Sequence, residues 1–160
     1  LLLSLGVVGD ASGKFNPKGS VTSADFIKML VLASGWEPGE GNELENVPDS
    51  WYAPYYQTAV YRGVLSADNL PKADKGVSRM ECARYLVGAL GLKKAADLEG
   101  IYKVPATDSA KIAGKDAGYA AIALKMGLLP DVSGKFEHGS VVSRGQAASI
   151  LVNYMKIADK

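Results

Sequence analysis

Two arginines stand where a helix normally favours an anion. Arg79 and Arg144 directly follow Ser78 and Ser143, which are expected to cap helices. The dipole and free N–H groups of a helix start disfavour a cation by about 0.3–1 kcal/mol. A carboxylate ligand could meet both the guanidinium and these N–H groups, whereas the alternatives are pairing with a nearby acidic residue or pointing to water. Because the rule is broken twice, both arginines are candidates for binding an acidic group, and the two alternatives stay open at this point. As exposed residues at helix starts, they are expected to be ones that the fold can lose.

Other chemistries find weaker support in the sequence. The loop from Asp10 is similar to a calcium loop, but Val21 stands where the twelfth residue should be a glutamate. “SGK” lacks the Gly-x-x-x-x-Gly-Lys frame of a phosphate loop. His138 is the only histidine and has no Cys or His partners for a metal site or a triad. We therefore expect no catalytic residues, no metal and no cofactor.

An internal repeat positions the two arginines. “GDASGKFNPKGSVTSADF” from Gly9 and “PDVSGKFEHGSVVSRGQA” from Pro130 align without a gap when the chain is shifted by 121 residues. A weaker third copy lies between them. The anchor valines of the copies are Val21, Val77 and Val142, at spacings of 56 and 65 residues.

Each copy predicts a short apolar helix, a polar loop and a second helix. A glycine ends the first helix each time, at Gly6, Gly63 and Gly127. Capping pairs start the second helices, at Thr22-x-x-Asp25, Ser78-x-x-Glu81 and Ser143-x-x-Gln146. Such a unit cannot bury its apolar face alone, so we expect a mostly α fold in which three helix-loop-helix repeats share one core. Cys82 falls on an apolar stripe and is expected to be a buried, inert thiol.

The bulk properties exclude several classes of protein. The 160 residues, 48% of them apolar and 22% charged, fit one globular domain. A net charge of +1 provides no strong field to select nucleic acid or an acidic membrane. The single cysteine cannot form an internal disulfide and does not decide the compartment. The start “LLLSLGVV” lacks the basic region and cleavage site of a signal peptide, and no segment approaches a membrane span.

The ordered motifs resemble the S-layer homology family, whose domains carry three tandem motifs of about this length. The second copy supplies “NVPDSWYAPYYQTAVYRGVL” and “VSRME”, the third “GYAAIALKMGLL”, “SGKF” and “VSRGQ”, and the first “LGVVGDASGKFNP” and “VTSAD”. No single piece is specific, whereas three ordered copies are a strong signal. The resemblance covers nearly the whole chain, 1–160, as one domain. It places motif 1, truncated at its N-terminus, at 1–40, motif 2 at 41–97 and motif 3 at 98–160.

The resemblance implies a pseudo-threefold helical prism that anchors an exported protein non-covalently to the bacterial cell wall. The implied ligand is an acidic, pyruvylated secondary cell-wall polysaccharide, bound in grooves between neighbouring motifs. Other copies of an S-layer protein are possible further partners. The implied location is extracellular, in the cell wall or S-layer, and we expect neither enzymatic activity nor membrane insertion. The glycan-binding residues implied are Arg79, Arg144, Glu81, Gln146, Trp51, Ser23, Gly63 and Gly127.

Departures from the family pattern leave an alternative function open. Ser23 stands where the family usually has arginine, and Gly145-Gln146 replaces Ala-Glu. The alternative is a structural or protein-interaction module of a surface-layer protein that has lost glycan binding; a small helical enzyme ranks lower. If glycan binding is retained, the two arginine-bearing grooves should hold it and the Ser23 groove should bind weakly. Trp51 could stack on a sugar ring, although packing is the commoner role.

Overall fold

The computed structural model describes residues 16–159, and its regular secondary structure is helical. The helices are α1 (Ser23–Ala33), α2 (Ala53–Tyr61), α3 (Arg79–Ala89), the single turn α4 (Lys93–Ala96), α5 (Ala117–Lys125) and α6 (Arg144–Ile157). Two 3-10 turns, Ser109–Lys111 and Gly114–Asp116, lead into α5. Across residues 16–159 the β pairing is confined to isolated bridges, which agrees with the predicted mostly α fold. The glycine expected to end a helix at Gly6 and the loop from Asp10 lie outside the described residues.

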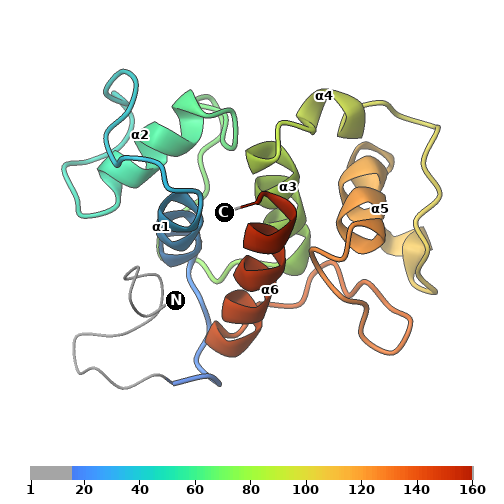
Figure 1. Ribbon diagram of the computed structural model, residues 1–160. Coiled ribbons are helices and arrows are strands. Elements are labelled where there is room, and N and C mark those ends of the chain that lie inside the picture. Colours follow the sequence, from blue (N-terminus) through green and yellow to red (C-terminus); the bar gives the residue numbers. More distant parts are fainter. Residues whose placement is uncertain (1–15, 160) are drawn as a thin grey trace.

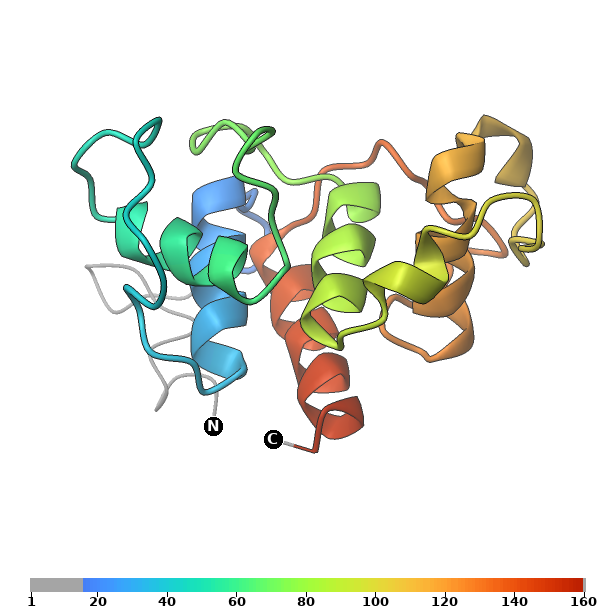
Figure 2. The ribbon, with the colours of Figure 1, turned by 90° about the horizontal axis from the view of Figure 1, so that it is seen from above.

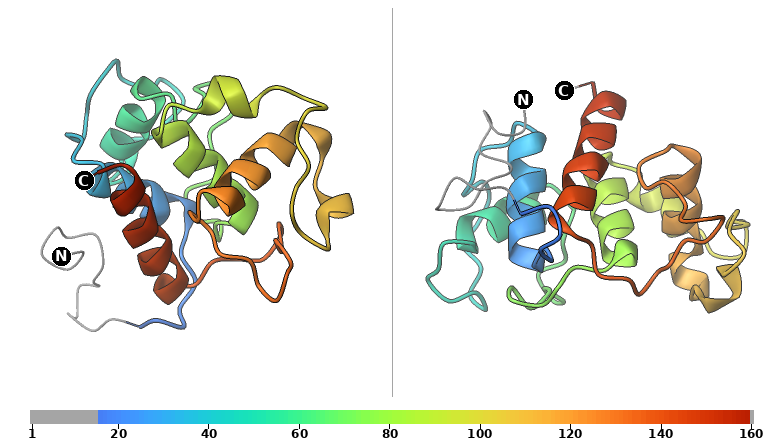
Figure 3. Two further views of the ribbon diagram at one scale, coloured as in Figure 1. Left: turned by 45° about the vertical axis from the view of Figure 1, so that its right-hand side comes forward. Right: turned by 90° about the horizontal axis from the view of Figure 1, so that it is seen from below.

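The helices pack in pairs that cross the predicted motif boundaries. α1 lies against α2, and α3 lies against α5, with α4 beside both α3 and α5 (Figure 1). The second helix of one predicted motif is thus paired with the first helix of the next. α6 packs on α1, and the views from above and below place it between the two pairs (Figures 2 and 3).

A closed ring of backbone hydrogen bonds joins the segments that precede α1, α3 and α6. The N–H of Val21 donates to the carbonyl of Val142 (3.0 Å). The N–H of Val142 donates to Val77 (2.9 Å), and the N–H of Val77 donates back to Val21 (2.9 Å). All three valines are fully buried. The anchor valines of the sequence repeat therefore meet at one point, where each donor and each acceptor of the ring is used once.

The predicted apolar stripes meet in one core among the described residues. Phe26 and Leu30 of α1, Leu86 of α3, and Leu151 and Tyr154 of α6 are all buried in a single cluster. The buried Tyr154 hydroxyl is hydrogen-bonded to the hydroxyl of Ser34 (2.8 Å), so its polar end is satisfied. The expectation of a shared core is confirmed for this part of the chain.

The helix-ending glycines predicted at Gly63 and Gly127 are confirmed. Both have left-handed backbone conformations, with φ of 75° and 72°. The residues that follow them, Val64 and Leu128, donate back to carbonyls of α2 and α5 at 2.8 and 2.9 Å. A residue with a Cβ would be strained here, so glycine reverses the chain at the end of each first helix.

Cys82 lies at the centre of the core and is fully buried, as the sequence predicted. Burial raises the pKa of its thiol above the ordinary value because the charged thiolate is desolvated. The thiolate is the reactive form, so we expect Cys82 to resist an aromatic disulfide reagent in the native protein and to react only as the chain unfolds. The check is the rate of thiol modification with and without denaturant. Equal rates would show that the thiol is accessible in the native state.

Candidate functional site

The starts of α1, α3 and α6 are held by equivalent local interactions. In each, a capping hydroxyl accepts a hydrogen bond from the backbone N–H three residues later; the caps are Thr22, Ser78 and Ser143. The side chains of Glu81 and Gln146 accept in return from the cap N–H at 2.8 and 2.9 Å, which completes two capping boxes. The shorter Asp25 accepts instead from the Thr22 hydroxyl (2.9 Å). Glu81 and Gln146 are therefore parts of the helix starts.

The first two backbone N–H groups of each of these helices donate to carbonyls in the loop that precedes a neighbouring helix. The first N–H groups, from Ser23, Arg79 and Arg144, donate to the carbonyls of Lys75, Ser140 and Gly19 at 2.8, 2.9 and 2.7 Å. The second N–H groups, from Ala24, Met80 and Gly145, donate to Ala73, His138 and Pro17, each at 3.0 Å. The amides of all three helix starts are thus used inside the protein. The expectation that a ligand carboxylate meets them is wrong.

Arg79 is buried, with 3% of its surface exposed. Its Nε donates to the carbonyl of Phe136 (2.7 Å) and an Nη donates to that of Pro130 (2.6 Å). The guanidinium carbon also lies 5.7 Å from the centre of the Phe136 ring. Burial lowers the pKa of the guanidinium from its ordinary value. The prediction of an exposed arginine is wrong here, because the loop of residues 130–136 folds over the start of α3 and uses the cation as an anchor.

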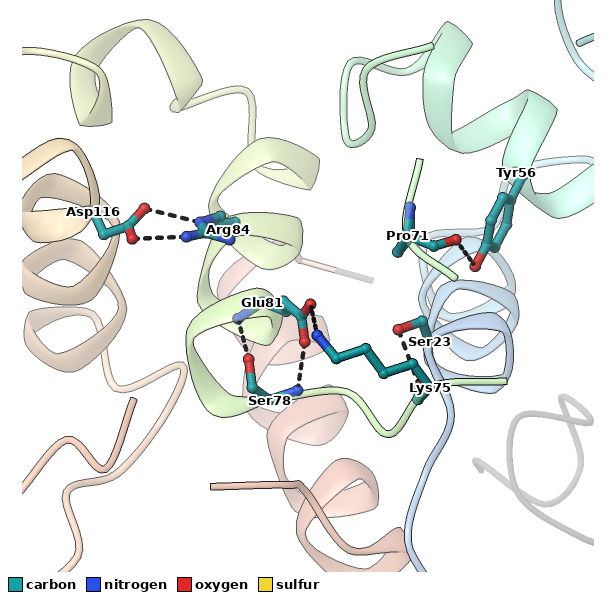
Figure 4. Close-up of polar contacts among 8 residues, drawn as sticks. All are labelled: Ser23, Tyr56, Pro71, Lys75, Ser78, Glu81, Arg84 and Asp116. Carbon is teal, nitrogen blue, oxygen red and sulfur yellow. Dashed lines mark hydrogen bonds and ion pairs between the residues drawn. The ribbon is translucent and has the colours of Figure 1, made fainter. Parts of the chain in front are cut away.

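The two positions equivalent to Arg79 differ from it and from each other. Ser23 is fully buried, and its hydroxyl donates to the carbonyl of Lys75 (3.3 Å; Figure 4). Arg144 is half-buried, and its Cδ lies over Gly19, where an added Cβ would be 3.5 Å away. Arg144 therefore remains a partly accessible candidate, whereas Arg79 and Ser23 belong to the interior.

Trp51 is 55% exposed, although packing was the commoner expectation. Its ring meets those of Tyr52 and Tyr55 edge-on, with centroids 5.7 and 6.5 Å apart. The Nζ of Lys28 lies 5.7 Å from the Trp51 ring centre and 5.8 Å from that of Tyr55. This cluster of an exposed aromatic ring and a cation lies on the α1–α2 pair.

A pocket of about 320 Å³ lies between the loop of residues 63–71 and the paired helices α3 and α5. Of the residues implied by the resemblance, Gly63 and Glu81 line it. Arg84, Tyr85 and Tyr119 complete its helical wall, and Lys93 contributes from α4. The other implied residues, which are Arg79, Arg144, Gln146, Trp51, Ser23 and Gly127, do not line this pocket.

Two ion pairs organise the charge of this pocket. Arg84 binds both carboxylate oxygens of Asp116, at 2.9 and 2.7 Å, across the α3–α5 contact (Figure 4). This hydrogen bonding raises the pKa of the guanidinium. Lys93 binds Asp97 (2.6 Å), and the hydrogen bond raises the pKa of the amine while lowering that of the carboxyl. The Tyr119 hydroxyl donates to the same Asp97.

Tyr85 also lines the pocket. It is nine-tenths buried, and its ring lies 6.3 Å from that of Phe26. Burial raises the pKa of its hydroxyl, which therefore stays protonated. The hydroxyl forms no hydrogen bond with residues 16–159, but it is not among their fully buried polar atoms that lack a partner, so water or a ligand can bond to it.

Metal binding and membrane crossing find no support in the described part of the chain. Between residues 16 and 159 no group of three or more His, Cys, Asp and Glu side chains could hold an ion. Over the same residues no helix combines the length and apolar character that a membrane span requires.

The sequence contained a signal for one wall of the pocket that motif matching missed. Shifting the chain by 56 residues aligns Lys28 with Arg84, so two copies carry a cation on the second turn of the second helix. The third copy has Ser149 at this place. Lys93 and Tyr119 had no comparable signal as site residues, because they reach the pocket only through the packing of α4 and α5 on α3.

Comparison with known proteins gives a coarse assignment. No family model matches the chain. The surface-layer 125 kDa protein of Lysinibacillus sphaericus is 31% identical over 103 residues. The match covers 61% of this chain but only 9% of that protein. The chain is therefore similar to a small part of a surface-layer protein.

Proposed function

We propose that this chain is a three-motif module that anchors a surface-layer protein to the bacterial cell wall, outside the cell, by binding an acidic secondary cell-wall polysaccharide. It is a binding module rather than an enzyme, and it acts without nucleic acid or membrane insertion. One observation carries the proposal. A cation-bearing pocket lies where the loop of motif 2 meets the α3–α5 pair, in a chain similar to a surface-layer protein.

The repeated contacts support a pseudo-threefold prism as the framework of this module. The valine ring and the equivalent N–H bonds relate the starts of α1, α3 and α6 by one pattern. The pairs α1–α2 and α3–α5 then form two prongs of the prism. In this arrangement a groove lies between consecutive prongs, which is where the pocket is found.

The pocket chemistry suits an acidic sugar. Arg84 uses its Nε and one Nη to bind Asp116, so its second Nη can donate to a ligand carboxylate. The Lys93 amine lies on the same wall, and the Tyr119 and Tyr85 rings provide apolar surface for a sugar face. The proposal therefore moves the central binding role from Arg79, which is buried, to Arg84.

A structural or protein-interaction module is the second candidate. It is favoured by the internal use of Arg79 and of the helix-start amides, which the sequence had assigned to the ligand. On this reading Arg84 and Lys93 serve only to hold α3, α4 and α5 together.

Binding to purified cell-wall sacculi, with and without their secondary polymer, separates the two candidates. We expect the parent protein to bind, and to lose binding when the polymer is stripped. The double variant Arg84→Gln/Asp116→Asn keeps a neutral hydrogen-bonded pair but removes the Arg84 cation from the pocket and leaves Lys93 in place. Loss of a hydrogen bond to a charged group should weaken binding by about ten- to a hundredfold.

Arg62→Gln is the matched control, because it removes an exposed guanidinium outside the pocket. It should bind walls like the parent. Folding of each variant is checked by circular dichroism and melting temperature. If the folded double variant binds like the parent, the pocket is not the site. If stripping the polymer does not change binding of the parent protein to the sacculi, the interaction module is the better assignment.

A further inference from the structure

The two ends of the molecule carry opposite charge. Residues 37–49, between α1 and α2, contain five acidic residues and no basic one. Residues 94–115, which run from within α4 to the turn before α5, contain four lysines against three acidic residues. Both ribbon views place these loops at opposite ends of the long dimension (Figures 1 and 2). We call them the acidic end and the basic end.

Most carboxylates of the acidic end form no ion pair with the described residues. Glu40 is paired with Arg62 at 2.5 Å. Glu37, Glu43 and Glu45 are exposed and form no ion pair with residues 16–159. A hollow of about 280 Å³ adjoins Glu43, and its lining includes Tyr61, which is 63% exposed. This end therefore combines unpaired carboxylates with an accessible apolar hollow.

The basic end has the complementary character. Its four lysines, which are Lys94, Lys103, Lys111 and Lys115, are exposed and have no ion pair among residues 16–159. One of its carboxylates, Asp108, is already bound to the N–H groups of Phe136 and Glu137 (2.8 and 2.9 Å). A shallow groove of about 700 Å³ runs along residues 102–110. Beside it, Ile101 is 67% and Leu98 is 55% exposed.

Exposed apolar side chains occur at or near both ends. The most exposed large apolar residues are Ile101 and Leu98 at the basic end, and Tyr61 and Trp51 at the two ends of α2. Exposed apolar groups rimmed by charge are typical of interaction sites. Aromatic residues are enriched at the centres of interfaces, and complementary charge brings the partners together in register.

We propose that the basic end of one copy of this chain docks on the acidic end of a second copy. Lys94, Lys103 and Lys111 then face Glu37, Glu43 and Glu45, and the aliphatic side chain of Ile101 enters the hollow beside Tyr61. The contact is heterologous, because each copy uses two different surfaces. One copy can therefore bind two neighbours, and the assembly grows as a row unless its geometry closes a ring.

Neither end includes a residue that lines the Arg84 pocket. Self-association is thus independent of wall binding, and the two proposals can fail separately.

Sedimentation of the 160-residue chain over a range of concentrations tests this proposal. At low salt we expect association that continues beyond dimers, and we expect high salt to suppress it because exposed charges are screened. Glu43→Lys/Glu45→Lys reverses the acidic end, and Lys103→Glu/Lys111→Glu reverses the basic end. Each variant alone should associate roughly tenfold more weakly, since attraction becomes repulsion across the contact.

An equimolar mixture of the two reversed variants should recover the association. The native basic end of the first variant fits the native acidic end of the second, and their reversed ends also carry opposite charges. Lys18→Glu/Lys156→Glu is the control for the basic-end variant, with the same change in net charge at exposed sites outside both ends. A parent that stays monomeric at high concentration and low salt overturns the proposal. So does association that survives both reversals in folded variants, or a mixture that fails to restore it.

Discussion

Arg79→Ala is expected to lower the free energy of unfolding by about 3 kcal/mol or more. The substitution removes two hydrogen bonds from a charged donor, to the carbonyls of Phe136 and Pro130, and leaves both acceptors in a cavity. Each such bond contributes about 1.5–3 kcal/mol. The measurement is equilibrium urea unfolding, followed by circular dichroism. This outcome reverses the sequence-based expectation that the fold tolerates the loss of this arginine.

Arg62→Ala makes the same chemical change at the surface and serves as its control. Arg62 pairs with Glu40 and lies 5.3 Å from the Trp36 ring, but its side chain is 38% exposed. Surface pairs of this kind contribute about 1 kcal/mol or less. Equal losses in the two variants would show that Arg79 does not anchor the loop of residues 130–136.

Gly118→Ala is expected to destabilise the protein by about 3 kcal/mol, although alanine normally stabilises a helix relative to glycine by up to about 1 kcal/mol. An added Cβ at Gly118 would lie 2.0 Å from the carbonyl oxygen of Ala96 and 2.8 Å from its carbon. Both atoms belong to the backbone, so relief requires α5 to move away from the α4 turn. The same urea titration measures the effect.

Gly114→Ala provides the comparison on the same segment. Nothing lies within 4 Å of a Cβ at Gly114. We therefore expect a change of about 0.5 kcal/mol or less. A Gly118→Ala variant as stable as the Gly114→Ala variant would mean that α5 does not pack closely on the α4 turn.

Local features of the fold were predictable from the sequence. The caps at Thr22, Ser78 and Ser143 were recognised because a hydroxyl that bonds the N–H three residues later is a short-range interaction. The Thr22 cap differs in one respect, since the shorter Asp25 side chain accepts from the Thr22 hydroxyl and does not complete a capping box. The glycines at the ends of α2 and α5 follow from the same local chemistry.

The candidate site was less predictable because its contacts are distant in sequence. Whether Arg79 points to water or inward depends on a loop more than 50 residues later, and no local pattern records that choice. Arg84 meets Asp116 at a separation of 32 residues. Only Gly63 and Glu81 were anticipated at the pocket, and they were taken from the family pattern rather than from the packing of α3 and α5.

The valine ring also sets the order in which the protein can assemble. Its hydrogen bonds link Val21 to Val142, so the ring closes only when nearly the whole chain is present. Closing so long a loop costs conformational entropy before the contact contributes any stability, and such contacts slow folding. On the ribosome, the starts of α1 and α3 can join early through the bond from Val77 to Val21, but the ring stays open until the residues before α6 emerge. We therefore expect the three copies to fold as one cooperative unit, not as separable modules.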